Sequence, residues 1–210
     1  MGTSRVLDIA RAHVGLCCCG PWREQFRNML GPTVPGFVWD LARRFIIHVQ
    51  GVSTCSSCCR AWMRLAGVDL PPGFYPFSGK DSFWGEHAWA ERIGAATTGR
   101  ARVGSAPSPG DIFWTPSHMG VIDQWGPTDN PYDSPAGQDV WTIDGGQECE
   151  RSDAGHEGKH LQAVHSVHRR FWFAEPEGVP HISTVLSPTL YGPKSEVLGW
   201  IRTADLPYKE

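Results

Sequence analysis

The sequence predicts an α+β domain, with helices in the first half of the chain and an antiparallel sheet in the second. Up to about residue 95 apolar residues recur at helical spacing, and from residue 111 onward the period changes to that of strands. The 210 residues include 24 Gly and 17 Pro, which indicates many turns and long connections rather than a helical bundle. The length fits one domain, expected at residues 1–175, with an extension of the same domain at 176–210.

The part of the chain before residue 51 has a helical pattern in several places. Residues 4–15 carry apolar side chains at helical spacing, and Gly15 can end this helix. Residues 22–30 and 37–49 also predict helices and are separated by a turn rich in Pro and Gly. We therefore expect a helical insertion at about 21–50.

The best-defined helix of the sequence covers residues 53–67. Ser53 or Thr54 can cap its first turn, and a glycine can end it. A further helix is expected at 82–95, followed by a polar linker of Gly, Ser and Pro up to Pro109. The expected strands follow at residues 111–114, 118–123, 140–144, 163–168 and 197–201.

Charge and hydropathy exclude several classes of protein. The chain has 19 Lys and Arg against 22 Asp and Glu, a formal net charge of −3, which provides no basic footprint for nucleic acid. No window reaches the roughly 18 apolar residues of a membrane span, and residues 1–12 lack the apolar segment and cleavage site of an export signal peptide. With 40% hydrophobic residues, the chain can form a packed core.

Seven cysteines, most of them in two clusters, lack the spaced pattern of a disulfide framework. One of them, Cys55, lies in the first turn of the best-defined helix, where unpaired N–H groups and the helix dipole stabilise a thiolate. Downstream, His118 opens a strand and can supply a base, and Asp144 ends the next strand and can orient the imidazole. Cys58 and Cys59 are expected in the core, although Cys58 is the rival nucleophile.

Two blocks of sequence surround these residues. The first is Thr54-Cys55-Ser56-Ser57 through Arg64-Leu65-Ala66-Gly67-Val68, and the second is Pro109-Gly110-Asp111-Ile112-Phe113-Trp114 followed by His118-Met119-Gly120-Val121-Ile122. Together with the opening helix, they resemble the NlpC-type and CHAP-type papain-like peptidoglycan hydrolases. The resemblance spans roughly residues 4–173, with Thr54 and Ser57 where that family usually has Asp and Gly.

The resemblance implies a papain-like fold, in which the helix that carries the nucleophile Cys55 packs on an antiparallel sheet. It implies His118 as general base and Asp144 as the third residue, with Gln147 as the alternative for the third role. It also implies an amide or peptide bond of a peptidoglycan stem peptide as substrate, cleaved without a cofactor or metal.

Delivery follows from the same resemblance. Without an export signal peptide, such a hydrolase is expected to reach the periplasm or cell wall of a target through a specialised secretion system or through phage lysis. In the first case it is an antibacterial effector, with a cognate immunity protein or a secretion carrier as partner.

Two metal-binding hypotheses compete with the thiol hydrolase. His156-Glu157-Gly158-Lys159-His160 matches the pattern of zinc hydrolases, in which two His on one helix face bind zinc and the Glu acts as base. The glycine inside this segment weakens the helix that such a site needs. The second alternative is a non-enzymatic interaction module with a thiolate zinc site, formed by Cys17, Cys19, Cys55 and Cys58.

Overall fold

The computed structural model describes residues 4–16, 23–30, 39–40, 45–46, 54–71, 89–98, 106–126, 137–147, 163–173, 180–187 and 190–210. In these residues, helices near the N-terminus lie beside one eight-stranded sheet whose neighbouring strands are antiparallel. The α+β class predicted from the sequence is therefore confirmed.

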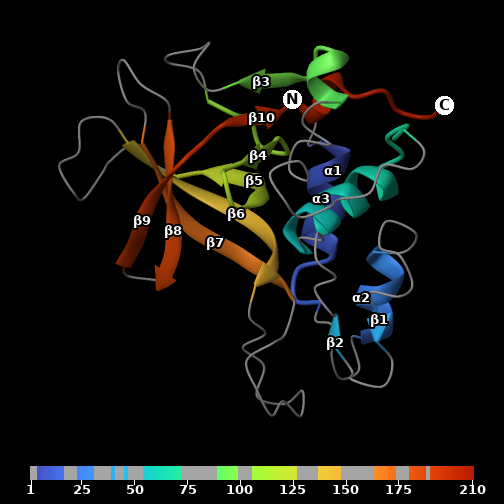
Figure 1. The fold of residues 1–210 in the computed structure, drawn as a ribbon, viewed down its shortest axis with the longest axis horizontal. Helices are drawn as coiled ribbons and strands as arrows, with labels where there is room; N and C mark the ends of the chain where they lie inside the picture. The colour runs from blue at the N-terminus through green and yellow to red at the C-terminus, as the bar shows by residue number, and fades with distance from the viewer. Residues whose placement is uncertain are drawn as a thin grey trace.

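Helices α1 and α3 lie beside the sheet, and α2 packs against α3 farther from it (Figure 1). Helix α1 spans Arg5–Ala12, α2 spans Arg23–Leu30 and α3 spans Thr54–Leu65. Both α1 and α2 pack against α3, and α3 in turn packs against strands β5 and β6. The helix that carries Cys55 is thus held between two other helices and the sheet.

The helix predicted at residues 37–49 is wrong. Strand β1, Trp39–Asp40, pairs with strand β2, Phe45–Ile46, as a short antiparallel pair. The physical reason lies in composition, because this segment is rich in aromatic and β-branched residues, which favour extended backbone. The insertion therefore combines helix α2 with a strand pair.

The main sheet has the strand order β3-β10-β4-β5-β6-β7-β8-β9. Its strands are β3 Ala96–Thr98, β4 Ile112–Trp114, β5 Met119–Trp125, β6 Gly137–Gln147, β7 Ala163–Phe173, β8 His181–Ser187, β9 Leu190–Glu196 and β10 Gly199–Ile201. Strands β4 to β7 and β10 confirm the five predicted strands. Strand β3 lies in the segment predicted as a linker, and β8 and β9 were not predicted.

The predicted helix at 82–95 is described only in its last part. Residues 89–92 are helical, and Trp89 and Ala90 in this turn are buried. Gly94 follows with a positive φ of 75°, a conformation that glycine adopts without a side-chain clash. Residues 82–88 of this prediction lie outside the described part of the chain.

The core lies between α3 and the central strands. Its largest fully buried side chains include Trp62 and Met63 of α3, Phe113 of β4 and Ile122 of β5. Each such side chain contributes about 1.5–3 kcal/mol through the apolar surface it removes from water. This packing fixes the position of α3 relative to β5 and β6, and thereby the position of Cys55.

The turn before β4 ties the two ends of the described chain together. The carboxylate of Asp111 accepts hydrogen bonds from the backbone N–H groups of Ser108, at 2.8 Å, and Thr203, at 3.1 Å. Gly110 has a φ of 96°, and a Cβ at this position would lie 2.3 Å from the Cβ of Ser4. The Gly-Asp pair of the second sequence block therefore has a structural role, because it lets the N-terminal and C-terminal segments meet.

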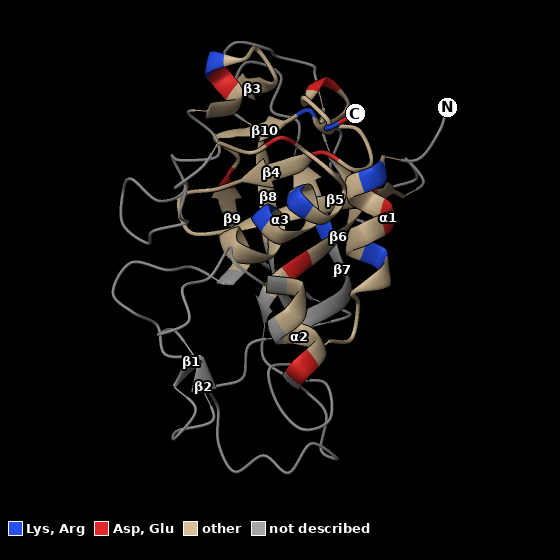
Figure 2. Ribbon diagram, turned by 90° about the vertical axis from the view of Figure 1, so that its right-hand side faces the viewer, with Lys and Arg blue, Asp and Glu red and all other residues tan. Residues whose placement is uncertain are grey.

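A buried carboxylate also links α1 to the sheet. Nε of Arg11 donates to Oδ1 of Asp123 on β5 at 2.6 Å, and this aspartate is 5% exposed. Figure 2 shows charges of both signs along α1, where Arg5 and Arg11 flank Asp8.

Candidate active site

Cys55 is the second residue of α3 and is 6% exposed. Its position places the thiol in the first turn of the helix, at the positive end of the helix dipole. Because α3 packs on β5 and β6, this end of the helix faces the strands that carry the other two predicted residues. The local sequence thus supplies an environment that favours a thiolate.

His118 lies directly before β5 and meets both of the other predicted residues. Its Nε2 donates to Oδ1 of Asp144 at 2.8 Å, and its ring also forms a side-chain hydrogen bond with Cys55. With Nε2 engaged by the carboxylate, Nδ1 is the ring nitrogen that remains for the thiol. The structure therefore brings Cys55, His118 and Asp144 together in the predicted order.

A tight turn fixes the backbone of His118. The backbone N–H of Thr115 donates to the carbonyl oxygen of His118 at 2.8 Å, and the Thr115 hydroxyl donates to the same oxygen at 3.3 Å. The imidazole lies 6.1 Å from the ring of Phe113, measured between ring centroids. Its side chain is 20% exposed, so the imidazole is largely but not completely enclosed.

The electrostatics of the site favour a charged imidazole. Burial acts to lower the pKa of His118, but the charges of Asp144 and Cys55 and the hydrogen bonds to both outweigh burial and raise this pKa to about 9. Sharing of a proton between thiol and imidazole is the arrangement that activates a cysteine nucleophile.

Asp144 is fully buried at the point where β6 faces β5. The register that pairs Val121 with Ile143 brings Gly120 opposite Asp144. A Cβ on Gly120 would lie 2.1 Å from Oδ1 of Asp144, so only glycine leaves room for the carboxylate beside His118. Gly120, in the block that carried the family resemblance, therefore has a direct geometric role in the site.

The two neighbouring cysteines differ from Cys55 in environment. Cys58 and Cys59 are both fully buried in the core. Burial, with a smaller contribution from the charge of Cys55, raises the pKa of the Cys58 thiol well above its ordinary value. Cys58, the rival nucleophile, is thus held as a neutral thiol.

Sequence reasoning missed a layer of polar residues behind Asp144. Arg170 of β7 is 4% exposed, and its Nη2 donates to Oδ2 of Asp144 at 3.1 Å. Thr142, also buried, donates to the same oxygen at 2.8 Å. The sequence held one signal for this layer. Arg170 and Trp172 are two positions apart in β7, so their side chains lie on the same face of the strand, which carries a large apolar residue.

Several predicted residues lie outside the described part of the structure. These are the side chain of Gln147 and the residues of both metal hypotheses other than Cys55 and Cys58, namely Cys17, Cys19, His156, Glu157 and His160. Among the residues that are described, no group of three or more His, Cys, Asp and Glu side chains is arranged to hold a metal ion.

Comparison with family models, with curated proteins and with solved structures finds no match to this chain. Within the described ranges, none of the helices has the length and apolar character needed to cross a membrane.

Proposed function

We propose that this protein is a papain-like cysteine hydrolase that cleaves an amide or peptide bond. The observation that carries the proposal is the chain of contacts from Cys55, at the N-terminus of a buried helix, through His118 to the buried carboxylate of Asp144. A nucleophile, a base and a group that orients the base are the parts that covalent acyl transfer requires.

The architecture around these residues supports the papain-like assignment. The thiol lies on a helix that packs against an antiparallel sheet. The imidazole lies in the turn directly before β5, and the carboxylate lies on the neighbouring strand β6. A nucleophile on a helix that packs on an antiparallel sheet is what the resemblance implies, and it supports the proposal.

The proposed reaction has two halves. The thiolate of Cys55 attacks the carbonyl carbon, and the imidazolium of His118 gives its proton to the leaving amine as the C–N bond breaks. Water, deprotonated by His118, then hydrolyses the thioester and releases a carboxylic acid, which restores the thiol. Asp144 holds the imidazole in one tautomer and ring orientation throughout.

Charge that develops on the carbonyl oxygen needs donors that are in place beforehand. Backbone N–H groups at the start of α3 fit this role, because Cys55 is the second residue of that helix and the first turn of a helix directs its N–H groups away from the helix body. Such preorganised donors contribute about 3 kcal/mol to transition-state stabilisation in acyl-transfer enzymes.

The substrate class comes from the sequence resemblance, which points to a stem peptide of peptidoglycan. An antibacterial effector delivered by a specialised secretion system, with a cognate immunity protein or carrier, fits such a hydrolase. Delivery by phage lysis is the other route to the same substrate.

Purified peptidoglycan is the direct test. The wild-type protein and the variants Cys55→Ala and Cys58→Ala are each incubated with it, and the products are identified by mass spectrometry together with labelling of new amino groups. We expect one new amine and one new carboxylate per cleavage with wild type and with folded Cys58→Ala, and none with Cys55→Ala. Undigested peptidoglycan with wild type would refute this substrate, and full activity of Cys55→Ala would refute the mechanism.

A further inference from the structure

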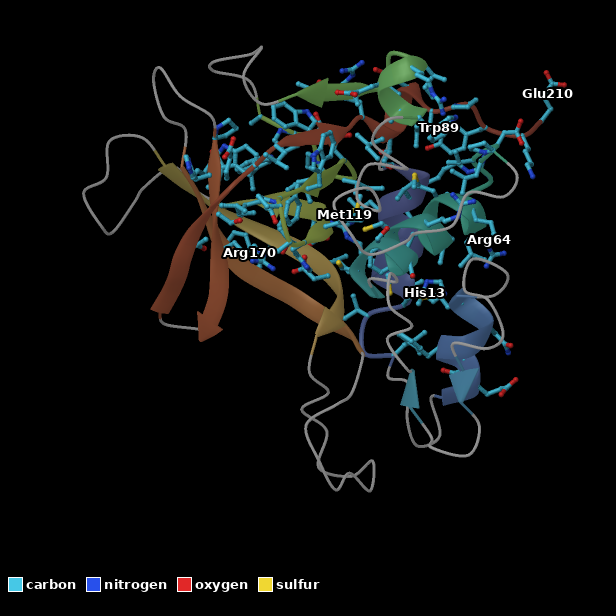
Figure 3. All side chains as sticks on the ribbon, viewed as in Figure 1. His13, Arg64, Trp89, Met119, Arg170 and Glu210 are labelled. Carbon is cyan, nitrogen blue, oxygen red and sulfur yellow. The ribbon has the colours of Figure 1, made fainter. Side chains whose placement is uncertain are left out.

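We propose that Arg170 is a positioning residue that holds Asp144 in the orientation in which it meets His118, an inference that rests on the proposed function. Arg170 lies on β7, one strand beyond Asp144, and its side chain reaches back across β6. In Figure 3 Arg170 lies among the strands, whereas Met119, the residue after His118, lies toward the helices.

Each nitrogen of the Arg170 guanidinium has a hydrogen-bond acceptor. Nε donates to the hydroxyl of Thr142 at 2.9 Å, Nη1 to the carbonyl oxygen of Ser183 on β8 at 2.9 Å, and Nη2 to Oδ2 of Asp144 at 3.1 Å. The guanidinium also lies over the ring of Phe113, 6.0 Å from its centroid. Contacts from β4, β6 and β8 therefore fix the arginine fork in one place.

This network determines which carboxylate oxygen faces the imidazole. Oδ2 of Asp144 accepts from both Thr142, at 2.8 Å, and Arg170, so the carboxylate cannot rotate without losing two hydrogen bonds. Oδ1 is left to accept from Nε2 of His118. Thr142 itself accepts from Arg170 and donates to Asp144, which closes a ring of three residues.

Arg170 also supplies a charge that does not change during the reaction. His118 gives up and regains a proton in each cycle, whereas a guanidinium stays protonated. A fully buried carboxylate needs such a permanent partner while the imidazole is neutral. The ionisable groups that meet here in the described chain are Cys55 from α3, His118 from the turn before β5, Asp144 from β6 and Arg170 from β7.

Loss of the positive charge makes nearby groups bind protons more tightly, so a neutral residue at position 170 should delay formation of the Cys55 thiolate as pH rises. Arg170→Met removes the charge at similar length, and Arg170→Lys keeps the charge but cannot reach three acceptors at once. Alkylation by iodoacetamide reports the thiolate without any substrate, and tandem mass spectrometry separates the label on Cys55 from labels on Cys58 and Cys59.

The midpoint of the alkylation profile is the pH at which the rate is half-maximal as the Cys55 thiolate forms. For Arg170→Met we expect this midpoint to rise by about one pH unit. With peptidoglycan, kcat should fall by roughly 100-fold while KM stays within about twofold, since Arg170 acts on the base and not on the substrate. Arg170→Lys should keep the midpoint within about 0.3 unit and lose about tenfold in kcat. If Arg170→Met does not fold, Arg170→Lys provides the test. An unchanged kcat in that variant would contradict the proposal that the Arg170 guanidinium positions Asp144.

Arg202 provides the matched control. Its guanidinium also makes several hydrogen bonds, to Asp205, Thr97 and the carbonyl oxygens of Ala96 and Gly94, but it follows β10 on the other side of β4. Arg202→Met removes the same charge and should leave the midpoint unchanged.

An equal midpoint shift in the Arg202 and Arg170 variants, or an unshifted midpoint in folded Arg170→Met, would overturn the inference. If the midpoint shifts only in the Arg170 variant and the wild-type protein leaves peptidoglycan intact, the positioning role of Arg170 is supported and peptidoglycan is refuted as the substrate. Cleavage of peptidoglycan with an unshifted midpoint would refute the role of Arg170 alone.

Discussion

Gly120→Ala tests whether the close approach of Asp144 to His118 controls turnover. The new Cβ would lie 2.1 Å from Oδ1 of Asp144 and 2.8 Å from the Phe113 ring, and ordinary van der Waals contact begins at 3.4 Å. The carboxylate oxygen must therefore move by about 1 Å or more, which breaks its 2.8 Å hydrogen bond with His118. A misplacement of about 1 Å costs on the order of 100-fold in rate, and complete loss of an orienting carboxylate costs about 10⁴-fold.

The assay combines turnover with titration of the imidazole by NMR. We expect kcat of Gly120→Ala to fall at least about 100-fold and the pKa of His118 to fall below its value of about 9, because Asp144 raises that pKa. Gly199→Ala is the matched steric control, since its Cβ would lie 2.3 Å from the Thr97 carbonyl oxygen and from Trp114. The control should lose stability but keep kcat per folded molecule. Parental kcat and an unchanged His118 pKa in Gly120→Ala would refute the reasoning.

Three further predictions concern single residues. Cys55→Ala should abolish hydrolysis, whereas Cys58→Ala should lower the free energy of unfolding by about 1–2 kcal/mol through a small core cavity and keep its activity, as denaturant unfolding and product analysis will show. Asp144→Ala should lower kcat by orders of magnitude, and Gln147→Ala should leave it at the parental value, because Asp144 already bonds His118; equal activity of both variants and wild type would contradict the triad. Burial raises the pKa of Asp111 from 3.8 to about 6, so this residue should contribute about 3 kcal/mol of stability that is fully present below pH 3.8 and lost as pH rises through about 6. Chemical denaturation across this range should show that contribution in wild type, and its persistence in Asp111→Asn would assign it to another group.

Local pattern accounts for the elements that the sequence predicted correctly. The helix that carries Cys55 has apolar residues at helical spacing, Cys58, Trp62 and Leu65, and is followed by Gly67, whose φ is 88°. The strand that follows His118 and the strand with Asp144 contain short runs of β-branched and aromatic residues, Val121-Ile122 and Val140-Trp141-Thr142-Ile143. These three segments contain, in chain order, the proposed nucleophile, base and orienting group.

The missed strands depend on tertiary pairing. Strand β3 has three residues, too few for a periodic pattern, and it forms by pairing with β10. Strand β9 contains Gly192 and Pro193, which argue against a strand in isolation, but its position at the edge of the sheet tolerates proline.

The layer behind the site could not be predicted from local sequence because its partners come from distant strands. Arg170 looks like a solvated surface residue next to Arg169, and the predicted strand ended before it, at residue 168. Its burial is stable only because Asp144, Thr142 and the carbonyl of Ser183 converge on it from β6 and β8. Such convergence is a property of sheet register, which periodicity does not specify.

The rate of Cys55 alkylation against pH, measured in wild type and in His118→Ala, tests the Cys55–His118 pair most directly. If thiol and imidazole form an ion pair, Cys55 should react rapidly at pH 7, and the wild-type profile should show an inflection near pH 9, where His118 loses its proton. In His118→Ala the rate at pH 7 should fall about tenfold or more, because the thiol then lacks the imidazolium that stabilises its thiolate, and the rate should rise with pH in a single step as the thiol itself ionises. Superimposable profiles for the two proteins would contradict the Cys55–His118 pair and, with it, the proposed cysteine hydrolase.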